Sequence, residues 1–251
     1  MIAVVTGAAS GMGREFSLTI KDNYSVSEIW AIDKDSVSLK ELKKESDIPI
    51  REIVLDLTKE DSFSKYKKML EEEKPDIGLL INAAGYGIFD SVKETDYKLN
   101  TGMIELNALG LTKMTLLSIP YMKEGKIINF ASMAAFQPIP YINIYAATKA
   151  YVLSFSRSLN RELKNDNIQV MAVCPFWTKT KFFDTAVTRN KVVKKYVVMY
   201  NPSDVIKKAW KDLKKKKDYS AYGFVTKFQI LLTKILPHRF VMWYWMKQQK
   251  L

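Results

Sequence analysis

The feature that most constrains the fold of this chain is a repeated alternation of short apolar runs with longer segments of helical period. The apolar runs, rich in β-branched residues, occupy residues 2–7, 28–33, 50–56, 77–82, 125–132 and 168–175. The helical candidates lie at about residues 11–23, 36–46, 59–73, 96–118, 145–165 and 202–216. Nearly continuous apolar strands separated by helices predict a parallel sheet covered on both faces, which is a doubly wound, three-layer α/β fold.

The sequence DYSAYG, at residues 218–223, adds a short seventh strand to this prediction. The chain has 251 residues and shows neither an internal repeat nor a linker. This length suits one domain with a full core, so we expect a single domain over residues 1–251, with a C-terminal helical extension at 224–251. In such sheets ligands bind beyond the carboxyl ends of the strands.

The cysteine content and the N-terminus predict a cytoplasmic protein. The single cysteine, Cys174, has no partner for an intramolecular disulfide, which is typical of a reducing compartment. It stands in the apolar run VMAVC, where we expect a buried thiol. The chain begins directly with a strand-like run, without the features of a signal peptide. No apolar run approaches the roughly 18 residues that span a bilayer.

The positive charge is concentrated towards the C-terminus. The net charge is +12, of which residues 201–251 carry +9. This distribution argues against a nucleic-acid role for the whole domain. It leaves room for a surface that meets anionic lipid or an acidic ligand.

A glycine-rich turn, TGAASGMG, follows the first strand at residues 6–13. Glycines at a strand-to-helix turn let the backbone approach a pyrophosphate, which the N–H groups at the helix N-terminus hold. The spacing G-x-x-x-G-x-G differs from the G-x-G-x-x-G of other dinucleotide-binding folds. Taken alone, the turn favours a nucleotide site only moderately, and a purely structural role is the alternative.

The following strand ends carry small or polar residues that fit a nucleotide. Asp33 ends the second strand, where its carboxylate can accept both hydroxyls of an adenosine ribose and repel a 2′-phosphate. This favours NAD, and NADP is the alternative because Lys34 adjoins. Asp56 and Leu57 end the third strand, and residues 82–85 end the fourth, so these positions are candidates for the adenosine side of the cleft.

The strongest candidate for chemistry is a set of three polar side chains. Tyr145 and Lys149 are four residues apart with small residues between, so on a helix they share one face. An ammonium group near a phenol is expected to lower the pKa of Tyr145 from its usual value of about 10, which would provide a general base. Ser132, at the end of the fifth strand, would meet Tyr145 across the cleft. Each residue taken singly also suits a structural role.

These motifs together resemble the short-chain dehydrogenase/reductase family in its single-domain form. TGAASGMG matches the family's T-G-x-x-x-G-x-G, NAAG at residues 82–85 matches its N-x-A-G, and Ser132 with YAATK at residues 145–149 matches its Ser and Y-x-x-x-K. The resemblance covers about residues 1–223. It implies a Rossmann fold and an oxidoreductase that transfers hydride between NAD(P) and a secondary alcohol or ketone.

The resemblance also implies a role for each catalytic residue. Tyr145 would exchange a proton with the substrate oxygen, Ser132 would orient that oxygen, and Lys149 would bind the nicotinamide ribose. Asn107, in IELNALG, matches the family's asparagine that holds a water in a proton relay. No metal is expected, because the single histidine, His238, has no companion ligands. Family members commonly form homodimers or homotetramers through helices that correspond to 96–118 and 145–165.

The predicted cofactor site collects the residues at these strand ends. It comprises Thr6, Gly7, Ser10, Gly11, Met12, Gly13, Asp33, Asp56, Leu57, Asn82, Ala83, Ala84, Gly85, Tyr145, Lys149, Pro175, Phe176, Thr178 and Thr180. One member departs from the family: Phe176 stands where a glycine usually follows Pro175. This substitution puts the local backbone geometry in doubt.

The substrate side is predicted to be apolar. In this family substrate choice resides in the segments that correspond here to residues 133–144 and 177–200. The candidate substrate residues are Ser132, Phe136, Ile139, Tyr141, Tyr145, Phe176, Trp177, Phe182 and Phe183. They favour a hydrophobic alcohol or ketone, such as a hydroxysteroid.

The tail at residues 224–251 has apolar residues at helical spacing with basic residues between, and it is broken at Pro237. Docking on the domain or on a second subunit is favoured, and peripheral membrane contact through the aromatic run at residues 243–245 is the alternative. Two further functions compete with the enzyme: a dinucleotide-binding regulator without catalysis, and an interaction protein of the membrane surface.

Overall fold

The computed structural model describes residues 1–186 and 192–251, and it confirms the predicted doubly wound α/β fold. The described strands form one parallel sheet in the order β3-β2-β1-β4-β5-β6-β7. The strands are β1 (Ile2–Thr6), β2 (Ile29–Asp33), β3 (Ile50–Val54), β4 (Ile77–Asn82), β5 (Gly125–Phe130), β6 (Ile168–Val173) and β7 (Tyr219–Ser220). From β1 the chain adds β2 and β3 on one side of the sheet and then crosses over to add β4 to β7 on the other side. Sheets of this kind bind ligands at this switch point, between β1 and β4.

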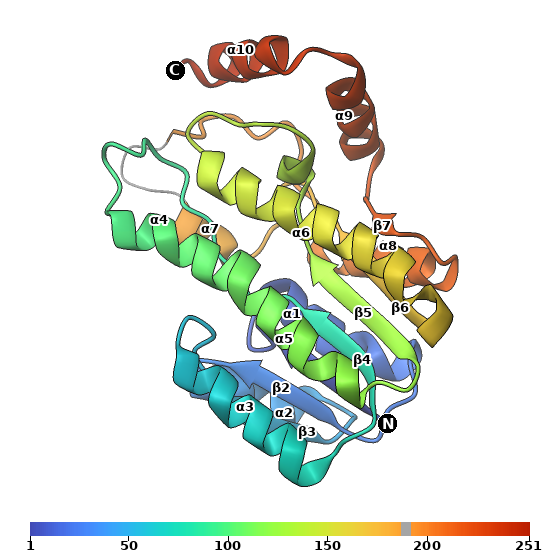
Figure 1. The fold of residues 1–251 in the computed structure, drawn as a ribbon. Helices are drawn as coiled ribbons and strands as arrows, with labels where there is room; N and C mark the ends of the chain where they lie inside the picture. Colours follow the sequence, from blue (N-terminus) through green and yellow to red (C-terminus); the bar gives the residue numbers. More distant parts are fainter. Residues whose placement is uncertain (187–191) are drawn as a thin grey trace.

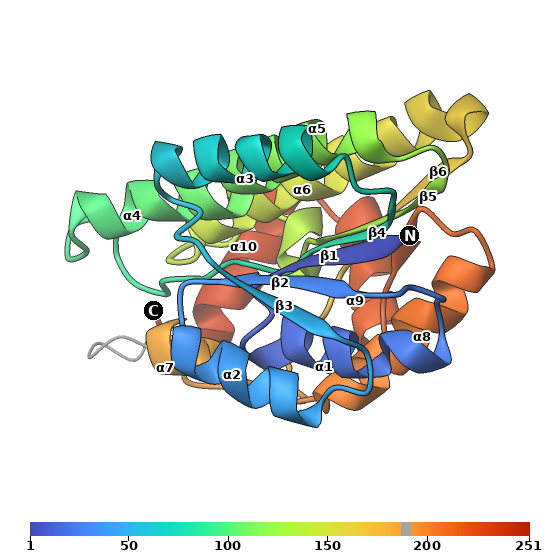
Figure 2. The same ribbon diagram turned by 90° about the horizontal axis from the view of Figure 1, so that it is seen from below.

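Helices cover both faces of the sheet (Figures 1 and 2). One face carries α1 (Gly11–Thr19), α2 (Ser36–Glu45) and α8 (Pro202–Lys214). The other carries α3 (Glu60–Glu73), α4 (Tyr97–Ile104), α5 (Leu111–Ser118) and α6 (Asn143–Glu162). The remaining helices are α7 (Phe182–Ala186), α9 (Phe224–Ile235) and α10 (His238–Gln249). Short 3-10 turns are η1 (Ile20–Asp22), η3 (Ile119–Tyr121), η4 (Met133–Phe136) and η5 (Leu163–Asp166).

The helix predicted at residues 96–118 is interrupted in its middle. A π-helical turn, η2 (Glu105–Gly110), joins α4 to α5. A wider turn of this kind often marks a functional site, and here it carries the buried Asn107. The pattern of apolar residues does not distinguish a π turn from an α turn, so the sequence predicted one continuous helix.

Helix α1 connects the first turn of the fold to the core of the sheet. The ring of Phe16 is fully buried, with its centroid 5.7 Å from that of Phe130 on β5 and 5.1 Å from that of Trp210 on α8. Both contacts are edge-to-face, an arrangement that aromatic pairs favour. Packing of α1 against a central strand and a neighbouring helix therefore fixes the position of the glycine turn that precedes it.

The C-terminal segment docks on the rest of the chain through one side of each helix. The helical segment is interrupted at Pro237, as predicted, and this residue separates α9 from α10. The buried Trp245 donates a hydrogen bond from Nε1 to the carbonyl oxygen of Pro140 at 3.1 Å. Gln249 accepts hydrogen bonds from the backbone N–H groups of Lys194 and Lys195 at 2.8 and 2.9 Å.

The division of the chain into one domain with an extension at 224–251 stays a prediction. In the described part of the chain, no helix combines the length and the apolar character needed to cross a membrane.

Candidate active site

The turn between β1 and α1 is built so that helix and strand lie in direct backbone contact. Gly7 and Gly11 have φ angles of +66° and +53°, a region that glycine accepts without steric cost. A Cβ on Gly13 would lie 2.2 Å from the carbonyl oxygen of Gly7, so no larger residue fits there. The three glycines therefore allow the first turn of α1 to open directly onto the space beyond β1.

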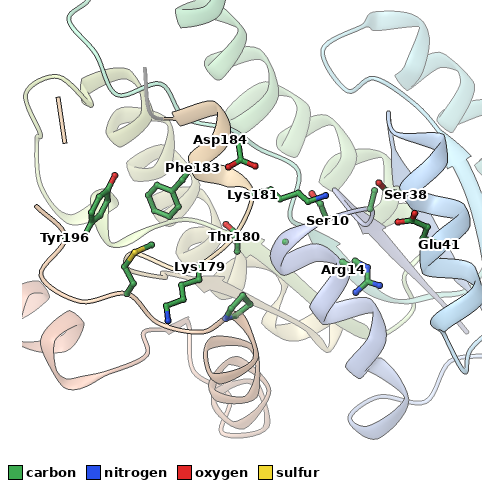
Figure 3. Close-up of a pocket in the computed structure, with 14 residues that line it drawn as sticks. Ser10, Arg14, Ser38, Glu41, Lys179, Thr180, Lys181, Phe183, Asp184 and Tyr196 are labelled. Carbon is green, nitrogen blue, oxygen red and sulfur yellow. The ribbon is translucent and has the colours of Figure 1, made fainter. Parts of the chain in front are cut away.

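An open groove of about 900 Å³ runs beside this turn (Figure 3). Ser10, Arg14 and Ser38 stand on the side of α1 and α2, and the segment from Lys179 to Asp184 forms the facing side. Figure 3 shows the Lys181 side chain reaching across the groove towards Ser10. The residues present fit a dinucleotide: the groove joins the N-terminus of α1 to three cations, Arg14, Lys179 and Lys181, which outnumber its two carboxylates, Glu41 and Asp184, and this suits the charge of a pyrophosphate.

Asp33, at the end of β2, is hydrogen-bonded to the glycine turn. Its Oδ2 accepts a hydrogen bond from the backbone N–H of Ala9 at 3.0 Å, and its Oδ1 accepts one from Asp35 at 3.1 Å. Each carboxylate oxygen retains a second lone pair for a further donor. Asp33 is thus positioned both to hold the loop and to accept a hydroxyl group.

The third strand end is organised by Asp56. Its Oδ1 accepts hydrogen bonds from the backbone N–H and the hydroxyl of Thr58 at 3.0 and 2.8 Å. Burial opposes the charged form, but the hydrogen bonds from Thr58 and the nearby ammonium of Lys34 outweigh it and lower the pKa of the Asp56 carboxyl. The neighbouring Leu57 is buried in the core.

Two of the predicted cofactor residues are turned into the protein interior. The hydroxyl of Thr6 accepts a hydrogen bond from the N–H of Ala84 at 3.3 Å, which joins the ends of β1 and β4. Asn82 donates to Thr115 and to Asn129, at 3.0 and 2.9 Å, and is 2% exposed. Both side chains therefore support the strand ends and do not line the groove.

Asn107 clamps the loop after β4 to helix α6. Its Oδ1 accepts a hydrogen bond from the N–H of Tyr86 at 3.0 Å, and its Nδ2 donates to the Tyr86 carbonyl at 2.8 Å and to Thr148 at 3.3 Å. A Cβ on Gly85 would lie 2.8 Å from Asn107 Oδ1 and 3.5 Å from Lys149 Nζ. Asn107 and Lys149 thus both lie close to Gly85. The role of Asn107 in a water relay stays a prediction.

The structure brings Ser132, Tyr145 and Lys149 together at the carboxyl edge of the sheet. Tyr145 lies in the first turn of α6 and Lys149 one turn later, as the spacing predicts. Ser132 and Tyr145 line the same cavity. Lys149 Nζ lies 5.7 Å from the centroid of the Tyr145 ring and donates a hydrogen bond to the carbonyl oxygen of Phe130 at 2.7 Å.

The structure contradicts the expectation that Lys149 lowers the pKa of Tyr145. Burial raises the pKa of the Tyr145 phenol to about 12, and interaction with the Ser132 hydroxyl offsets only part of this. Burial also lowers the pKa of the Lys149 ammonium to about 8, with a smaller opposing effect from Cys174, which is buried as predicted. Desolvation disfavours both charged forms, and the ammonium group is directed to Phe130 and not to the phenol.

An apolar cavity of about 70 Å³ is lined in part by Ser132 and Tyr145. The following predicted substrate residues line this cavity: Ser132, Ile139, Tyr145, Phe176, Trp177, Phe182 and Phe183. Four residues of the predicted cofactor set, Met12, Pro175, Thr178 and Thr180, line it as well. Thr180 and Phe183 line both this cavity and the groove. The groove and the cavity therefore adjoin each other at these two residues.

Phe136 and Tyr141 lie outside the lining of this cavity, contrary to prediction. Phe136 ends the 3-10 turn η4, and its ring is directed to Tyr219 of β7 at a centroid distance of 5.7 Å. Tyr141 lies in the turn before α6 with a φ angle of +65°. The segments at these positions turn sharply, so neighbouring residues along the chain face different directions.

The phenylalanine at the family's glycine position causes no backbone strain. The backbone of Phe176 lies outside the positive-φ region, so a glycine is not required there. The side chain lines the cavity. Of the predicted substrate segment 177–200, residues 187–191 lie outside the described residues.

The sequence reasoning missed Phe89 as part of the site. Its ring centroid lies 5.8 Å from that of Tyr145 and 5.9 Å from that of Phe182, and it lines the cavity. Phe182 itself lies 5.5 Å from Tyr145, so two phenylalanines cover the phenol. The position of Phe89, a few residues beyond the strand-end motif NAAG, was the available signal, because all residues there emerge at the same edge of the sheet.

The fold and the site define a dinucleotide-binding protein with a Ser–Tyr–Lys set at the sheet edge. A family model described as short chain dehydrogenase matches residues 1–191. The chain therefore belongs to the short-chain dehydrogenase family.

Curated relatives and solved structures agree with this assignment. Very-long-chain 3-oxoacyl-CoA reductase of Bos taurus is 34% identical over 190 residues, 71% of this chain and 60% of that protein. An uncharacterized oxidoreductase of Staphylococcus epidermidis is 28% identical over 69% of this chain and 76% of that protein. The chain thus spans about 60% of the length of the reductases that it matches.

Among solved structures, a short-chain dehydrogenase from Sphingobium yanoikuyae in complex with NADPH superposes with a TM-score of 0.79 at 24% identity, over 92% of this chain and 91% of that one. A short-chain dehydrogenase/reductase from Burkholderia phymatum in complex with NAD gives a TM-score of 0.78 at 22% identity, over 96% and 93% of the two chains. At this identity the likeness shows the fold.

The burial of Lys149 predicts a stability that depends on pH. The pKa of Lys149 is about 8 in the folded protein and 10.5 when unperturbed, so keeping the buried ammonium charged lowers the free energy of unfolding at pH 7. This destabilisation disappears as the pH rises from about 8 to 10.5, because the folded protein then holds a neutral amine. We expect Lys149→Met to raise the free energy of unfolding at pH 7 by on the order of 1–3 kcal/mol. The gain should shrink above pH 8. Urea unfolding across this range measures it, with Lys68→Met on α3 as the exposed control, and a gain independent of pH would contradict the prediction.

Proposed function

We propose that the protein is an oxidoreductase that transfers hydride between a nicotinamide dinucleotide and the oxygen-bearing carbon of a hydrophobic ketone or secondary alcohol. The observation that carries the proposal is the apolar cavity that Ser132 and Tyr145 both line, where it adjoins the groove beside the glycine turn. The dinucleotide, when bound, supplies the hydride. The residues of the chain then bind, orient and exchange the proton.

Ser132 and Tyr145 have distinct roles in this proposal. The Ser132 hydroxyl orients the substrate oxygen by a hydrogen bond, and the Tyr145 phenol donates a proton to it during reduction. Burial raises the pKa of Tyr145 to about 12, so the phenol is protonated at neutral pH, as it also is at its usual pKa of about 10, and this is the form that a proton donor needs. In the opposite direction the phenol would act as a base, and a neighbouring positive charge would have to lower its pKa.

The substrate proposed is hydrophobic, with its size and exact class left to experiment. Aromatic and aliphatic side chains form most of the cavity wall, and desolvation of an apolar ligand there favours binding. The curated relatives named very-long-chain 3-oxoacyl-CoA reductase give no particular support for a hydroxysteroid. A substrate panel should therefore contain 3-oxoacyl thioesters and bulky ketones as well as steroids.

For the cofactor we propose NAD in preference to NADP. The support is the carboxylate of Asp33 at the end of β2, which would repel a 2′-phosphate and accept ribose hydroxyls. Arg14 and Ser38 line the same groove and provide the alternative contacts for a phosphate. Structural neighbours bind each cofactor, NADPH in one and NAD in another.

We also propose self-association through α4, α5 and α6. Ile104, Leu109 and Leu116 are about half exposed on the first two of these helices and the intervening π turn. Tyr151 of α6 lies beside them, with its hydroxyl 2.9 Å from that of Thr112. Large apolar side chains on two adjacent helices form the kind of surface that a second copy covers.

Replacing Tyr145 with phenylalanine tests the proton-transfer role. We expect kcat/KM for ketone reduction to fall by about 10²- to 10⁴-fold, because the proton donor is removed, while the dissociation constant of the dinucleotide changes little. Tyr151→Phe, on the same helix but outside the cavity, is the matched control and should retain activity. Undiminished turnover in Tyr145→Phe would contradict the mechanism. If the unaltered protein binds the dinucleotide tightly but reduces no member of the panel, the catalytically silent regulator is favoured.

Replacing Asp33 with serine tests the cofactor proposal. We expect the ratio of kcat/KM with NADP to that with NAD to rise by about 10- to 100-fold, because the carboxylate no longer repels the 2′-phosphate. Asp47→Ser, at an exposed aspartate that does not line the groove, should leave the ratio unchanged. A strong preference of the unaltered protein for NADP would refute the role given to Asp33.

Replacing Leu116 with glutamate tests self-association. A buried carboxylate without a partner is costly, so we expect the mass measured by light scattering to fall to that of a monomer, while the matched variant Val37→Glu on α2 keeps the parent mass. Light scattering that finds the unaltered chain already monomeric at micromolar concentration would contradict the proposal.

A further inference from the structure

Helix α9 presents its more apolar side to the outside of the molecule. Phe224, Phe228, Leu231 and Ile235 are 81%, 50%, 52% and 69% exposed. Their spacing of four, three and four residues places them on one face of the helix. The rings of Phe224 and Phe228 also stack, with centroids 6.0 Å apart. A helix of a globular protein normally turns such a face towards the core.

The inward side of α9 is the more polar one. Its buried residues are Thr226, Ile230 and Thr233. The Thr226 hydroxyl has no hydrogen-bond partner within the described chain, although such a group is usually paired when buried. The helix therefore buries two threonines while it exposes two phenylalanines, a leucine and an isoleucine. This inversion leaves a contiguous apolar face of α9 on the surface, which is a feature of interaction sites.

Helix α10 repeats the arrangement. Phe240, Trp243 and Tyr244 are 49%, 54% and 56% exposed and share one face of the helix. The inward residues Trp245 and Gln249 hold the helix to the domain by the hydrogen bonds described above. Both helices lie together at one end of the molecule, beside α6 (Figure 1).

The charge of these helices limits what the partner can be. Residues 224–251 contain five basic side chains, Lys227, Lys234, Arg239, Lys247 and Lys250, and no aspartate or glutamate. In a symmetric dimer the same patch faces itself, so two such surfaces would bring like charges together, which opposes association. An anionic surface is complementary to them.

Trp243 and Tyr244 favour a lipid surface over an acidic protein. Tryptophan and tyrosine are enriched at the boundary between lipid headgroups and acyl chains, and here Lys247 Nζ lies 5.1 Å from the centroid of the Trp243 ring. We propose that the outward faces of α9 and α10 form a docking surface for an anionic phospholipid bilayer, on which the two helices lie in the plane of the headgroups.

This docking would place the substrate cavity next to the bilayer. Ile230, on the inward side of α9, packs in a cluster with Met133, which lines the cavity, and Phe176 packs against the same cluster. Trp245 of α10 belongs to the same buried cluster as Tyr145. A hydrophobic substrate dissolved in the membrane would thus have a short path to the site. The docking surface itself does not depend on the proposed activity.

The test is co-sedimentation of the full chain with vesicles. Phosphatidylcholine vesicles are compared with vesicles that contain about 30% phosphatidylserine, which provides an anionic surface. We expect binding to the anionic vesicles that is at least about tenfold tighter and that weakens in about 0.5 M salt. Equal partitioning of the chain to both vesicles, or recovery of the chain in the supernatant in both cases, would overturn the proposal.

Two pairs of substitutions assign the binding to this surface. Phe224→Ser with Ile235→Ser removes exposed apolar area, and Lys227→Glu with Lys234→Glu reverses charge on the same helix face. Each pair should weaken binding by about tenfold or more. The matched controls are Val37→Ser with Val54→Ser, at valines 66% and 54% exposed near the far edge of the sheet, and Lys67→Glu with Lys68→Glu on α3. Both controls should bind like the unaltered protein, and weakening by the controls to the same extent would overturn the assignment.

Light scattering of the same variants separates lipid from a second copy. All these positions are exposed, so thermal unfolding should confirm that the variants fold. If the α9 substitutions turn an oligomer into a monomer without affecting vesicle binding, the face is a subunit interface and the proposal is wrong. If they weaken vesicle binding while the mass in solution is unchanged, the bilayer is the partner.

Discussion

The arrangement of the site depends on the close approach of α1 to the end of β1. No side chain fits between Gly13 and the carbonyl of Gly7, where a Cβ would be 2.2 Å from oxygen. This contact sets the first turn of α1 against the strand, and Phe16, further along the same helix, packs against Phe130 of β5 and Trp210 of α8. The geometry of the glycine turn is therefore maintained by the core as well as by the turn itself.

Burial is the second determinant of the site. Tyr145 and Lys149 are 9% and 5% exposed, and two phenylalanines cover the phenol. The loss of hydration shifts both groups towards their neutral forms. A protonated phenol suits proton donation to a carbonyl, whereas a cationic lysine requires additional hydrogen-bond acceptors or negative charge. The ribose hydroxyls of a bound dinucleotide would provide such acceptors, because they carry free lone pairs.

The C-terminal helices pack against the domain on one side and expose apolar side chains on the other. Their inward sides hold them to the domain through Trp245, Gln249 and Ile230. Their outward sides expose aromatic and aliphatic groups that water alone does not stabilise. A helix of this kind can connect the wall of the substrate cavity to an external apolar phase. The proposed docking would give a physical role to the five basic side chains of residues 224–251.

Much of the fold and of the site followed from the sequence alone. Parallel strands joined by right-handed crossovers bring all their carboxyl ends to one edge. For this reason the motifs that end the first, second, fourth and fifth strands could be placed around one cleft, and Tyr145 and Lys149 one turn apart beside it. Local periodicity and connection chirality are sufficient for these conclusions, because each depends on residues close together in the chain.

Only the tertiary structure decided the direction of the pKa shifts, the covering of Tyr145 by Phe89, and the exclusion of Phe136 and Tyr141 from the cavity. It alone showed which side of α9 faces outward. These properties depend on how far each group is removed from water and on what packs against it from distant parts of the chain. The sequence determined which groups meet at the sheet edge, and packing determined their environment.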